Sequence, residues 1–122
     1  MEVLNAVITN VTIELSHRGF LMANVILKTK DDEFEWRRRL SEDGTAHCLE
    51  RFLHYTGVKT IEEMKGKIVR VTICHGALYG FAHPINDSFV PMFGDKVGWQ
   101  FTPITFEEML KQYLKEKDSG DE

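Results

Sequence analysis

Hydrophobic and polar residues alternate with a period of two in the N-terminal third of the chain, which is typical of β-strands with one buried face. Residues 3–15, 20–28 and 34–40 alternate in this way, and turn-forming residues separate them at 17–19 and 30–32. The pattern therefore predicts consecutive strands joined by hairpin turns. On the first strand, the hydrophobic residues predicted to share the buried face are Val3, Val7, Val11, Ile13 and Leu15.

The hydrophobic spacing changes from that of a strand to that of a helix after the third strand. Gly44 and Thr45 are typical of a helix start, and Gly57 is typical of the position just after a helix end. Between them, hydrophobic residues recur at helical spacing, which predicts a helix with one face toward the core. The predicted inward residues of this helix are Leu49, Phe52 and Leu53.

Capping signals predict two further helices. Thr60 and Glu63 have the spacing of a capping box, and Gly66 would end the short helix behind it. Thr105 and Glu108 repeat the capping pattern before a longer stretch with hydrophobic residues at helical spacing. The chain between these helices is predicted to form strands at residues 68–74 and 78–84, followed by an irregular loop at 85–98.

The resulting order of elements is β-β-β-α-α-β-β-α. It predicts an α+β fold with a mainly antiparallel β-sheet and two or three helices on one side. A length of 122 residues corresponds to one domain, which we expect to span residues 1–117. Residues 118–122 are polar and acidic, and we expect them to form a disordered tail.

Charge narrows the range of ligands. The net charge is −4, and residues 106–122 hold six acids against three lysines, so the remainder of the chain carries a net −1. DNA and RNA bind by releasing counterions from a broad basic surface, which this composition does not provide. A small phosphorylated ligand needs only a few well-placed cations. The sequence therefore disfavours a nucleic-acid polymer and leaves a compact anionic ligand open.

Hydropathy and cysteine usage indicate the cell compartment in which we expect the protein. No hydrophobic run approaches the roughly 18 residues of a membrane span, and the N-terminus begins directly with a strand pattern. We therefore expect no contact with a membrane and no signal or transit peptide. Cys48 and Cys74 lie in apolar segments, and we expect them to be small core residues in a reducing cytoplasm.

The predicted helix that begins at Gly44 carries two features that favour an anion. The free backbone amides at a helix start and the helix dipole both favour phosphate. His47, Arg51 and His54 also share a helix face opposite the hydrophobic residues, with no acid among them. Arginine offers a planar fork that matches phosphate oxygens. A solvated helix start and a solvated polar face remain the alternatives.

Aromatic and small residues alternate in the strand Tyr79-Gly80-Phe81-Ala82-His83, close to Asn86. Small residues between aromatics leave room for a planar ring, and stacking of a base on an aromatic side chain contributes about 1–3 kcal/mol. Aromatic side chains that pack the core are the alternative. The basic strand Trp36-Arg37-Arg38-Arg39 fits protection of a sheet edge and ligand binding equally well.

Cysteine and histidine residues show no pattern of a metal centre or a nucleophile. Neither a CxxC nor an HxxxH spacing occurs, and a lone cysteine in an apolar segment is usually unreactive. Cys48 with His83 as a nucleophile and base is equally unsupported. We therefore expect no metal, no cofactor and no catalysis.

Several short motifs, in their order and spacing over most of residues 3–91, resemble a family of small phage proteins that counter the Thoeris defence system, the first described type of anti-Thoeris sponge. The chain departs from the family pattern by an inserted Arg18, by His47 in place of a tyrosine and by Ser88 in place of a tryptophan. The third strand also has arginines where the family tends to have glycines. The matching segments are His17-Arg18-Gly19-Phe20, Gly44-Thr45-Ala46-His47-Cys48-Leu49-Glu50, Lys65-Gly66-Lys67-Ile68-Val69-Arg70-Val71, Gly80-Phe81-Ala82-His83 and Asn86-Asp87-Ser88-Phe89.

This resemblance implies a protein that sequesters a cyclic ADP-ribose isomer in the host cytoplasm without degrading it. Cyclic di- or trinucleotides would be further ligands at a separate pocket. The resemblance also implies a homo-oligomer, a dimer or a trimer of dimers, with ligand sites where protomers meet. The residues that we expect to bind the ligand are His17, Arg18, Gly44, Thr45, His47, Arg51, Phe81, His83 and Asn86.

Two other functions are weighed against the sponge. A phage inhibitor that binds a host defence protein directly, through the acidic C-terminal helix, is the alternative function. An enzyme that degrades the signal is disfavoured by the lack of a paired acid and base. In the sponge, Arg18 and Arg51 would contact phosphate, Gly44 and Thr45 would support it, Phe81 would stack on a base, and His47, His83 and Asn86 would hydrogen-bond to base or ribose.

Overall fold

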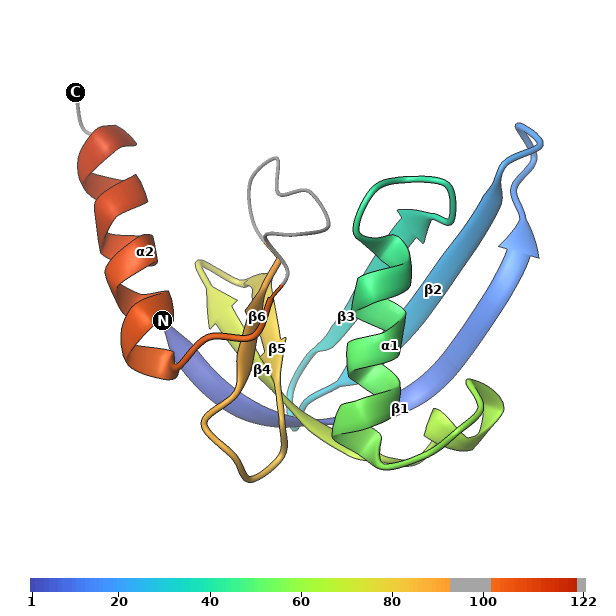
Figure 1. The fold of residues 1–122 in the computed structure, drawn as a ribbon, viewed down its shortest axis with the longest axis horizontal. Coiled ribbons are helices and arrows are strands. Elements are labelled where there is room, and N and C mark those ends of the chain that lie inside the picture. The colour runs from blue at the N-terminus through green and yellow to red at the C-terminus, as the bar shows by residue number, and fades with distance from the viewer. Residues whose placement is uncertain (93–101, 121–122) are drawn as a thin grey trace.

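A six-stranded antiparallel β-sheet curls around helix α1 (Figure 1). The computed structural model describes residues 1–92 and 102–120. Neighbouring strands follow the order β3-β2-β1-β4-β5-β6, and every adjacent pair is antiparallel. The predicted α+β class with a mainly antiparallel sheet is therefore confirmed. The strands are β1 (Glu2–Leu15), β2 (Leu21–Lys28), β3 (Glu33–Arg39), β4 (Ile68–Cys74), β5 (Ala77–Ala82) and β6 (Phe89–Pro91).

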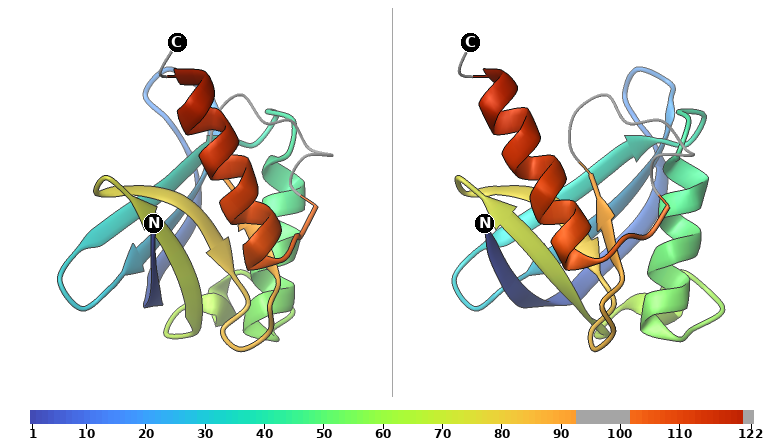
Figure 2. Two further views of the ribbon diagram at one scale, coloured as in Figure 1. Left: turned by 90° about the vertical axis from the view of Figure 1, so that its left-hand side faces the viewer. Right: turned by 60° about the vertical axis from the view of Figure 1, so that its left-hand side comes forward.

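Helices lie on both faces of the sheet within the described residues, so the prediction that they lie on one side is wrong. Helix α1 (Thr45–Thr56) follows β3 and packs in the curl of the sheet, whereas α2 (Phe106–Gly120) lies at the other end of the molecule (Figures 1 and 2). A short 3-10 helix, η1 (Glu62–Met64), connects α1 to β4. No helix in residues 1–92 or 102–120 is both long enough and apolar enough to cross a membrane.

The main core lies between α1 and the inner face of the sheet. Phe52 of α1 is fully buried at its centre and contacts Trp36 of β3 edge to face, with ring centroids 5.6 Å apart. Leu49 is also buried, and the partly buried Leu53 packs against the same cluster. The inward face predicted for this helix is therefore confirmed.

A β-bulge interrupts the alternation of β1. The register between β1 and β2 shifts directly after Ile8. Ala6 and Ile8 are buried, whereas Val3 and Val7 are 36% and 39% exposed. The prediction that Val3 and Val7 lie on the buried face is wrong, because one extra residue in a strand reverses which positions point inward. Beyond the bulge, Val11 packs against the core as predicted. Ile13 and Leu15, which were also predicted to lie on the buried face, are 41% and 69% exposed, so that part of the prediction is wrong.

Helix α2 covers a second, smaller core on the outer face of β5 and β6. Met109 of α2 is fully buried there and lies directly above Gly80. A Cβ atom at Gly80 would be 2.5 Å from Met109 Cε and 2.6 Å from the carbonyl oxygen of Val90. The room that the sequence pattern predicted above Gly80 is therefore filled by α2. The buried residues of this second core are Tyr79, Ala82, Phe89 and Met109.

Helix ends follow the predicted signals. Gly57 ends α1 in a left-handed conformation at φ 71°, and its N–H donates to the carbonyls of His54 and Leu53. The N–H of Glu108 donates to the Thr105 hydroxyl at 3.2 Å, which confirms that capping box. The equivalent bond from Glu63 N–H to the Thr60 hydroxyl is 3.4 Å long. The second predicted helix is nonetheless only a 3-10 turn.

Two predictions for the C-terminal third need correction. Helix α2 continues to Gly120, so residues 118–120 are helical and not disordered. Lys115, Glu116 and Lys117, which follow the last hydrophobic residue Leu114, are good helix formers, and the helix continues through them. The predicted loop at 85–98 contains strand β6, and its part from 93 to 98 lies outside the described residues, as do 121 and 122.

Candidate ligand-binding site

The predicted ligand-binding residues lie in three separate places. Two of them are exposed in the turn between β1 and β2, at the upper right of Figure 1. Others lie at the start of α1, and the rest lie on its second half or near the end of β5. One protomer therefore does not bring them all into a single site. The three groups are His17 and Arg18; Gly44, Thr45 and His47; and Arg51, Phe81, His83 and Asn86.

The start of α1 is not open to phosphate. Thr45 is 2% exposed, and its hydroxyl donates a 2.9 Å hydrogen bond to the Arg39 carbonyl. The crevice beside Gly44 is lined by Glu42, Asp43 and Arg38, which is already paired with Glu42 at 3.2 Å, and it is too small to admit a water molecule. A hydroxyl that is already bonded and two adjacent acids disfavour an anion. The structure therefore does not support the predicted phosphate contact of Gly44 and Thr45.

His47 lies one turn further along α1 and remains accessible. Its side chain is 66% exposed, and its Nδ1 is 4.0 Å from a carboxylate oxygen of Glu50. A carboxylate this close would compete with an anionic ligand for the imidazole. His47 is therefore a weaker candidate than the residues on the second half of the helix.

Phe81 is a core residue. Its side chain is fully buried, and its ring stacks on Phe52 with centroids 3.9 Å apart. The Tyr55 ring contacts it edge to face at 5.8 Å. The prediction that Phe81 stacks on a base is therefore wrong, because Phe52 already occupies the ring face that a base would need.

Arg70 of β4 fixes the connection between β5 and β6. Its Nε donates a 2.8 Å hydrogen bond to the His83 carbonyl, and an Nη donates to the Asn86 carbonyl. Its guanidinium also lies 5.0 Å from the centroid of the Phe89 ring. Bonds from one planar guanidinium to two carbonyls hold the backbone of this loop in one conformation. The loop is visible below β5 and β6 in Figure 1.

The loop in turn orients the imidazole of His83. The backbone N–H groups of Ile85 and Asn86 donate to His83 Nδ1 at 3.0 Å and 2.9 Å. A nitrogen that accepts two hydrogen bonds carries no proton, so the neutral imidazole carries its proton on Nε2. His83 is partly exposed. Its Nε2–H is therefore a hydrogen-bond donor for a ligand base or ribose.

Tyr55 joins the loop to α1. Its hydroxyl lies 2.5 Å from the Ser88 hydroxyl, and its ring contacts the His83 ring edge to face at 5.5 Å. Burial raises the pKa of Tyr55 above its ordinary value, although the Ser88 bond and the Arg51 charge act in the opposite direction. Tyr55 is therefore a neutral phenol at physiological pH. The Arg51 guanidinium lies 5.8 Å from the Tyr55 ring centroid.

We call this arrangement the loop site; it consists of Arg51, Tyr55, Arg70, His83, Asn86 and Ser88. It offers cations and neutral hydrogen-bond donors, which suit phosphate and ribose oxygens. The acid in the loop, Asp87, accepts a 2.7 Å hydrogen bond from the Phe106 N–H at the start of α2. Ile85 beside it is 83% exposed and offers an apolar contact to a ring.

Two hollows of ligand size lie elsewhere in the described residues. One of about 400 Å³ is mostly apolar and lies between β1 and the end of β2, with Lys28 and Lys30 among its lining residues. Another of about 380 Å³ lies beside Phe20 and Arg39. Neither includes a residue of the loop site.

Sequence reasoning missed Arg70, Tyr55 and Ser88. Arg70 is the single charged residue in an otherwise apolar strand, which is a signal that it points away from the core. Its partners are carbonyl groups 13 and 16 residues further along, and no sequence pattern marks a backbone acceptor. Tyr55 lies four residues after Arg51 on the same helix face, a spacing that could have paired them.

The structure also shows the state of the Cys48 thiol and whether potential metal ligands come together in the described residues. Burial raises the pKa of the Cys48 thiol from 9.0 to about 12; the Arg38 charge opposes this shift and the Glu42 charge adds to it. At neutral pH Cys48 is therefore a thiol and not a reactive thiolate. In residues 1–92 and 102–120, no three His, Cys, Asp or Glu side chains come together as a group that could hold a metal ion.

Comparisons with known proteins add no relative. Neither the scan against protein-family models nor the searches of curated proteins and solved structures finds a significant match.

Proposed function

We propose that this protein captures a small cyclic nucleotide signal at the loop site and does not degrade it, acting in the cytoplasm of an infected host. The observation that carries this proposal is the pair of bonds from Arg70 to the carbonyls of His83 and Asn86. Because they fix the loop before a ligand arrives, less conformational entropy is lost on binding.

The chemistry of the site fits a cyclic ADP-ribose isomer. Such a ligand carries phosphates, ribose hydroxyls and a base in one closed shape. The planar fork of Arg51 suits the phosphate oxygens, and His83 Nε2–H and the Asn86 amide suit ribose or base. Ile85 supplies an exposed apolar surface for the base in place of the buried Phe81. Cyclic di- and trinucleotides share these groups and are the other candidates.

Capture without turnover is supported by the state of the titratable groups. His83 Nδ1 is occupied by two backbone donors, and Tyr55 is held as a neutral phenol. The Cys48 thiol is buried and protonated. The side chains around a bound ligand would therefore act as hydrogen-bond partners.

Native mass spectrometry with a panel of cyclic ADP-ribose isomers, cyclic oligonucleotides and linear ADP-ribose tests the proposal. We expect a cyclic isomer to remain bound and to be released intact on heating. At about a thousandfold excess over Kd, a ligand that binds only the folded state adds roughly 4 kcal/mol, a rise in Tm on the order of 10 °C. Release of a linear product, or an equal Tm rise with linear ADP-ribose, would contradict it.

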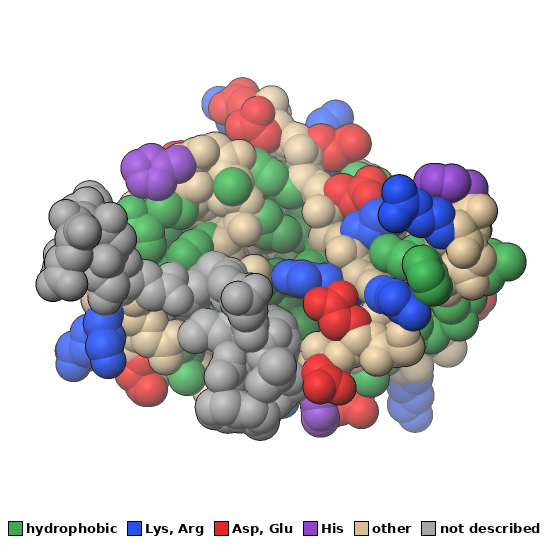
Figure 3. Space-filling model, turned by 90° about the horizontal axis from the view of Figure 1, so that it is seen from above, with side chains coloured by type: hydrophobic (Ala, Val, Ile, Leu, Met, Phe, Trp, Pro, Cys, Tyr) green, Lys and Arg blue, Asp and Glu red, His purple; other side chains and the backbone are tan. Residues whose placement is uncertain are grey.

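A direct inhibitor of a host defence protein is the second candidate, and one observation favours it. Hydrophobic side chains are exposed around the turn between β1 and β2, where Leu15 is 69% and Phe20 is 39% exposed. Figure 3 shows hydrophobic, basic and histidine side chains together at this end of the molecule. Such a mixed patch is typical of a protein-binding surface.

A protection assay in infected cells separates the two candidates. If the protein captures a signal, Arg51→Ala should abolish protection, and Leu15→Ser with Phe20→Ser should leave it intact. If the protein blocks a partner directly, the two variants should behave in the opposite way.

A further inference from the structure

Strand β3 forms one edge of the sheet, and its outer side has no strand partner in the described residues. The Leu40 N–H donates to the Leu21 carbonyl of β2, so the even-numbered positions of β3 direct their backbone groups toward β2. By alternation, the backbone groups of Glu33, Glu35 and Arg37 face the open side. They form a template for pairing with another strand.

Charged side chains on this edge follow a definite order. Glu33 and Glu35 occupy the first half of β3, and Arg37 and Arg39 occupy the second half. All four are exposed and lie on the outer face, whereas Trp36 at the centre is buried on the inner face. Edges that carry one sign of charge repel copies of themselves. This edge carries acids and then bases, so it is complementary to itself when reversed.

We propose that a second copy of this chain pairs with β3, antiparallel, about a twofold axis at Trp36. In this register Glu35 lies opposite Arg37 of the second copy, and Glu33 lies opposite its Arg39. Backbone hydrogen bonds form between the Glu35 and Arg37 positions, where the groups facing outward meet. The joint continues the sheet from one copy to the other, and each contact occurs twice, as in any twofold interface.

Other registers of this strand pair are disfavoured, because they would place like charges opposite each other or outer-face side chains opposite inner-face ones. A shift by two residues places Arg37 opposite Arg37 or Glu35 opposite Glu35, and like charges directly opposite each other destabilise a strand pair. A shift by one residue would place outward side chains opposite inward ones. The register about Trp36 is the one that pairs opposite charges at all four outer positions. At each end of the paired strands, the Arg39 carbonyl already accepts a hydrogen bond from the Thr45 hydroxyl. The contact between Glu33 and Arg39 of the other copy is therefore made by their side chains.

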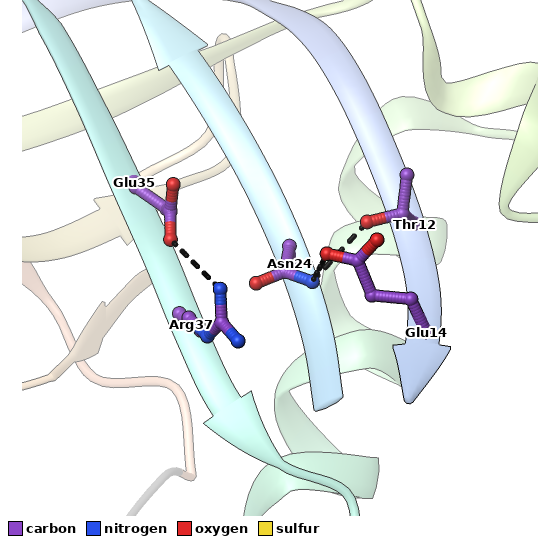
Figure 4. Close-up of polar contacts among 5 residues, drawn as sticks. All are labelled: Thr12, Glu14, Asn24, Glu35 and Arg37. Atoms are coloured by element: carbon purple, nitrogen blue, oxygen red, sulfur yellow. Dashed lines mark hydrogen bonds and ion pairs between the residues drawn. The ribbon is translucent and has the colours of Figure 1, made fainter. Parts of the chain in front are cut away.

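Within one copy the central charges, Glu35 and Arg37, are only weakly satisfied, whereas the Arg39 guanidinium lies 3.7 Å from the centroid of the Phe20 ring. Glu35 and Arg37 approach each other at 3.9 Å, with 47% and 42% of their side chains exposed (Figure 4). The nearby acid Glu14 is bonded instead to the Asn24 amide, which also donates to Thr12. Arg37 and Glu35 therefore retain capacity for a partner across the edge.

Single charge reversals test the joint in the absence of any nucleotide. We expect the wild-type protein to sediment at twice its 14.1 kDa at about 100 µM. Glu35→Lys alone and Arg37→Glu alone should each weaken the dimer at least about tenfold, since each creates two like-charge contacts. An equimolar mixture of the two variants should restore the dimer, because every cross-strand contact is again between opposite charges.

The mixture is decisive because it restores only the contact between copies. The Glu35–Arg37 pair within each chain stays broken in both variants. Lys65→Glu, an exposed reversal of the same size outside β3, is the matched control and should leave the dimer unchanged. A wild-type monomer at this concentration, or a dimer that both reversals leave intact, would overturn the proposal. Neither result bears on capture of a signal at the loop site.

Discussion

The rings of Phe52 and Phe81 lie face to face, with centroids 3.9 Å apart and planes 10° apart. Both side chains are fully buried, and they join α1 to β5 across the core. Stacked aromatic pairs contribute about 0.5–1.5 kcal/mol beyond the area that they bury. The contact therefore positions the helix that carries Arg51 against the strand that leads to His83.

Phe81→Ala should destabilise the protein through a cavity and not through the loss of a ligand contact. We expect the free energy of unfolding to fall by about 3–5 kcal/mol. Urea denaturation without ligand measures this loss. If Phe81→Ala kept wild-type stability and lost only ligand affinity, the ring would have to leave the core to contact a ligand.

This residue illustrates what sequence can decide. The strand was predicted correctly, because hydrophobic and small residues alternate between turn signals. An aromatic residue between Gly80 and Ala82 fits a stacking platform and a core position equally well. Its place in the core depends on Phe52, which is 29 positions earlier in the chain and meets it only when the sheet curls around α1. Local sequence pattern contains no signal for that contact.

Gly80→Ala should loosen α2 from the sheet. The added Cβ would meet Met109 Cε at 2.5 Å and the Val90 carbonyl oxygen at 2.6 Å. Met109 is flexible, but the Val90 oxygen belongs to the adjacent strand and cannot move independently. We expect a loss of about 1–3 kcal/mol from overpacking.

Thermal melting measures the loss, and Ala77→Ser at an exposed position of β5 is the control. An unchanged Tm for Gly80→Ala would mean that α2 does not pack on Gly80 in solution.

The bulge in β1 shows a second limit of sequence reasoning. Both sets of positions in this strand carry hydrophobic residues, so Val3 with Val7 and Ala6 with Ile8 are equally plausible inward faces. The bulge after Ile8 selects the second set and then returns the alternation to Val11. Which set points inward is decided by the pairing of β1 with β2, and the sequence of β1 alone does not determine that pairing.

Arg70→Lys should release the loop at residues 83–88 without unfolding the protein. A lysine ammonium cannot reproduce the two bonds that the planar guanidinium donates to the carbonyls of His83 and Asn86. We expect faster hydrogen exchange at the amides of Ile85 and Asn86, which would lose their fixed bonds to His83 Nδ1. Exchange in α1 should stay the same. Equal protection of the loop in both proteins would show that Arg70 does not hold it.

Stability should fall in alkaline solution through Cys48. Its pKa is raised from 9.0 to about 12 by burial, so the unfolded thiol ionises first as the pH rises. A group whose pKa is higher in the folded state stabilises the protein below the unfolded pKa and loses this contribution above it. From pH 9 toward 12, this residue should remove up to about 1.4 kcal/mol per pH unit.

Cys48→Ser isolates this contribution, since a serine hydroxyl does not titrate in this range. The difference in free energy of unfolding between wild type and variant, measured by urea denaturation at about pH 8 and about pH 10.5, should shrink as the pH rises. A constant difference would show that the Cys48 thiol ionises equally in both states.

Arg51→Ala should abolish capture and leave the fold nearly unchanged. Arg51 is partly exposed and lies beside the Tyr55 ring at the margin of the core, so its truncation removes no buried side chain, and such changes usually stay within about 0.5 kcal/mol. Loss of a charge-assisted bond to phosphate costs about 1.5–3 kcal/mol, or roughly ten- to hundredfold in affinity. His54→Ala, an exposed truncation one turn later on the same helix, is the matched control.

Titration calorimetry with the cyclic isomer, alongside melting curves, separates affinity from stability in both variants. We expect weak or absent binding by Arg51→Ala and wild-type binding by His54→Ala, with similar Tm values for all three proteins. Wild-type affinity in Arg51→Ala would remove this residue from the site. A ligand would then have to depend on His83 and Asn86 alone, and the Asn86→Ala variant would become the deciding measurement.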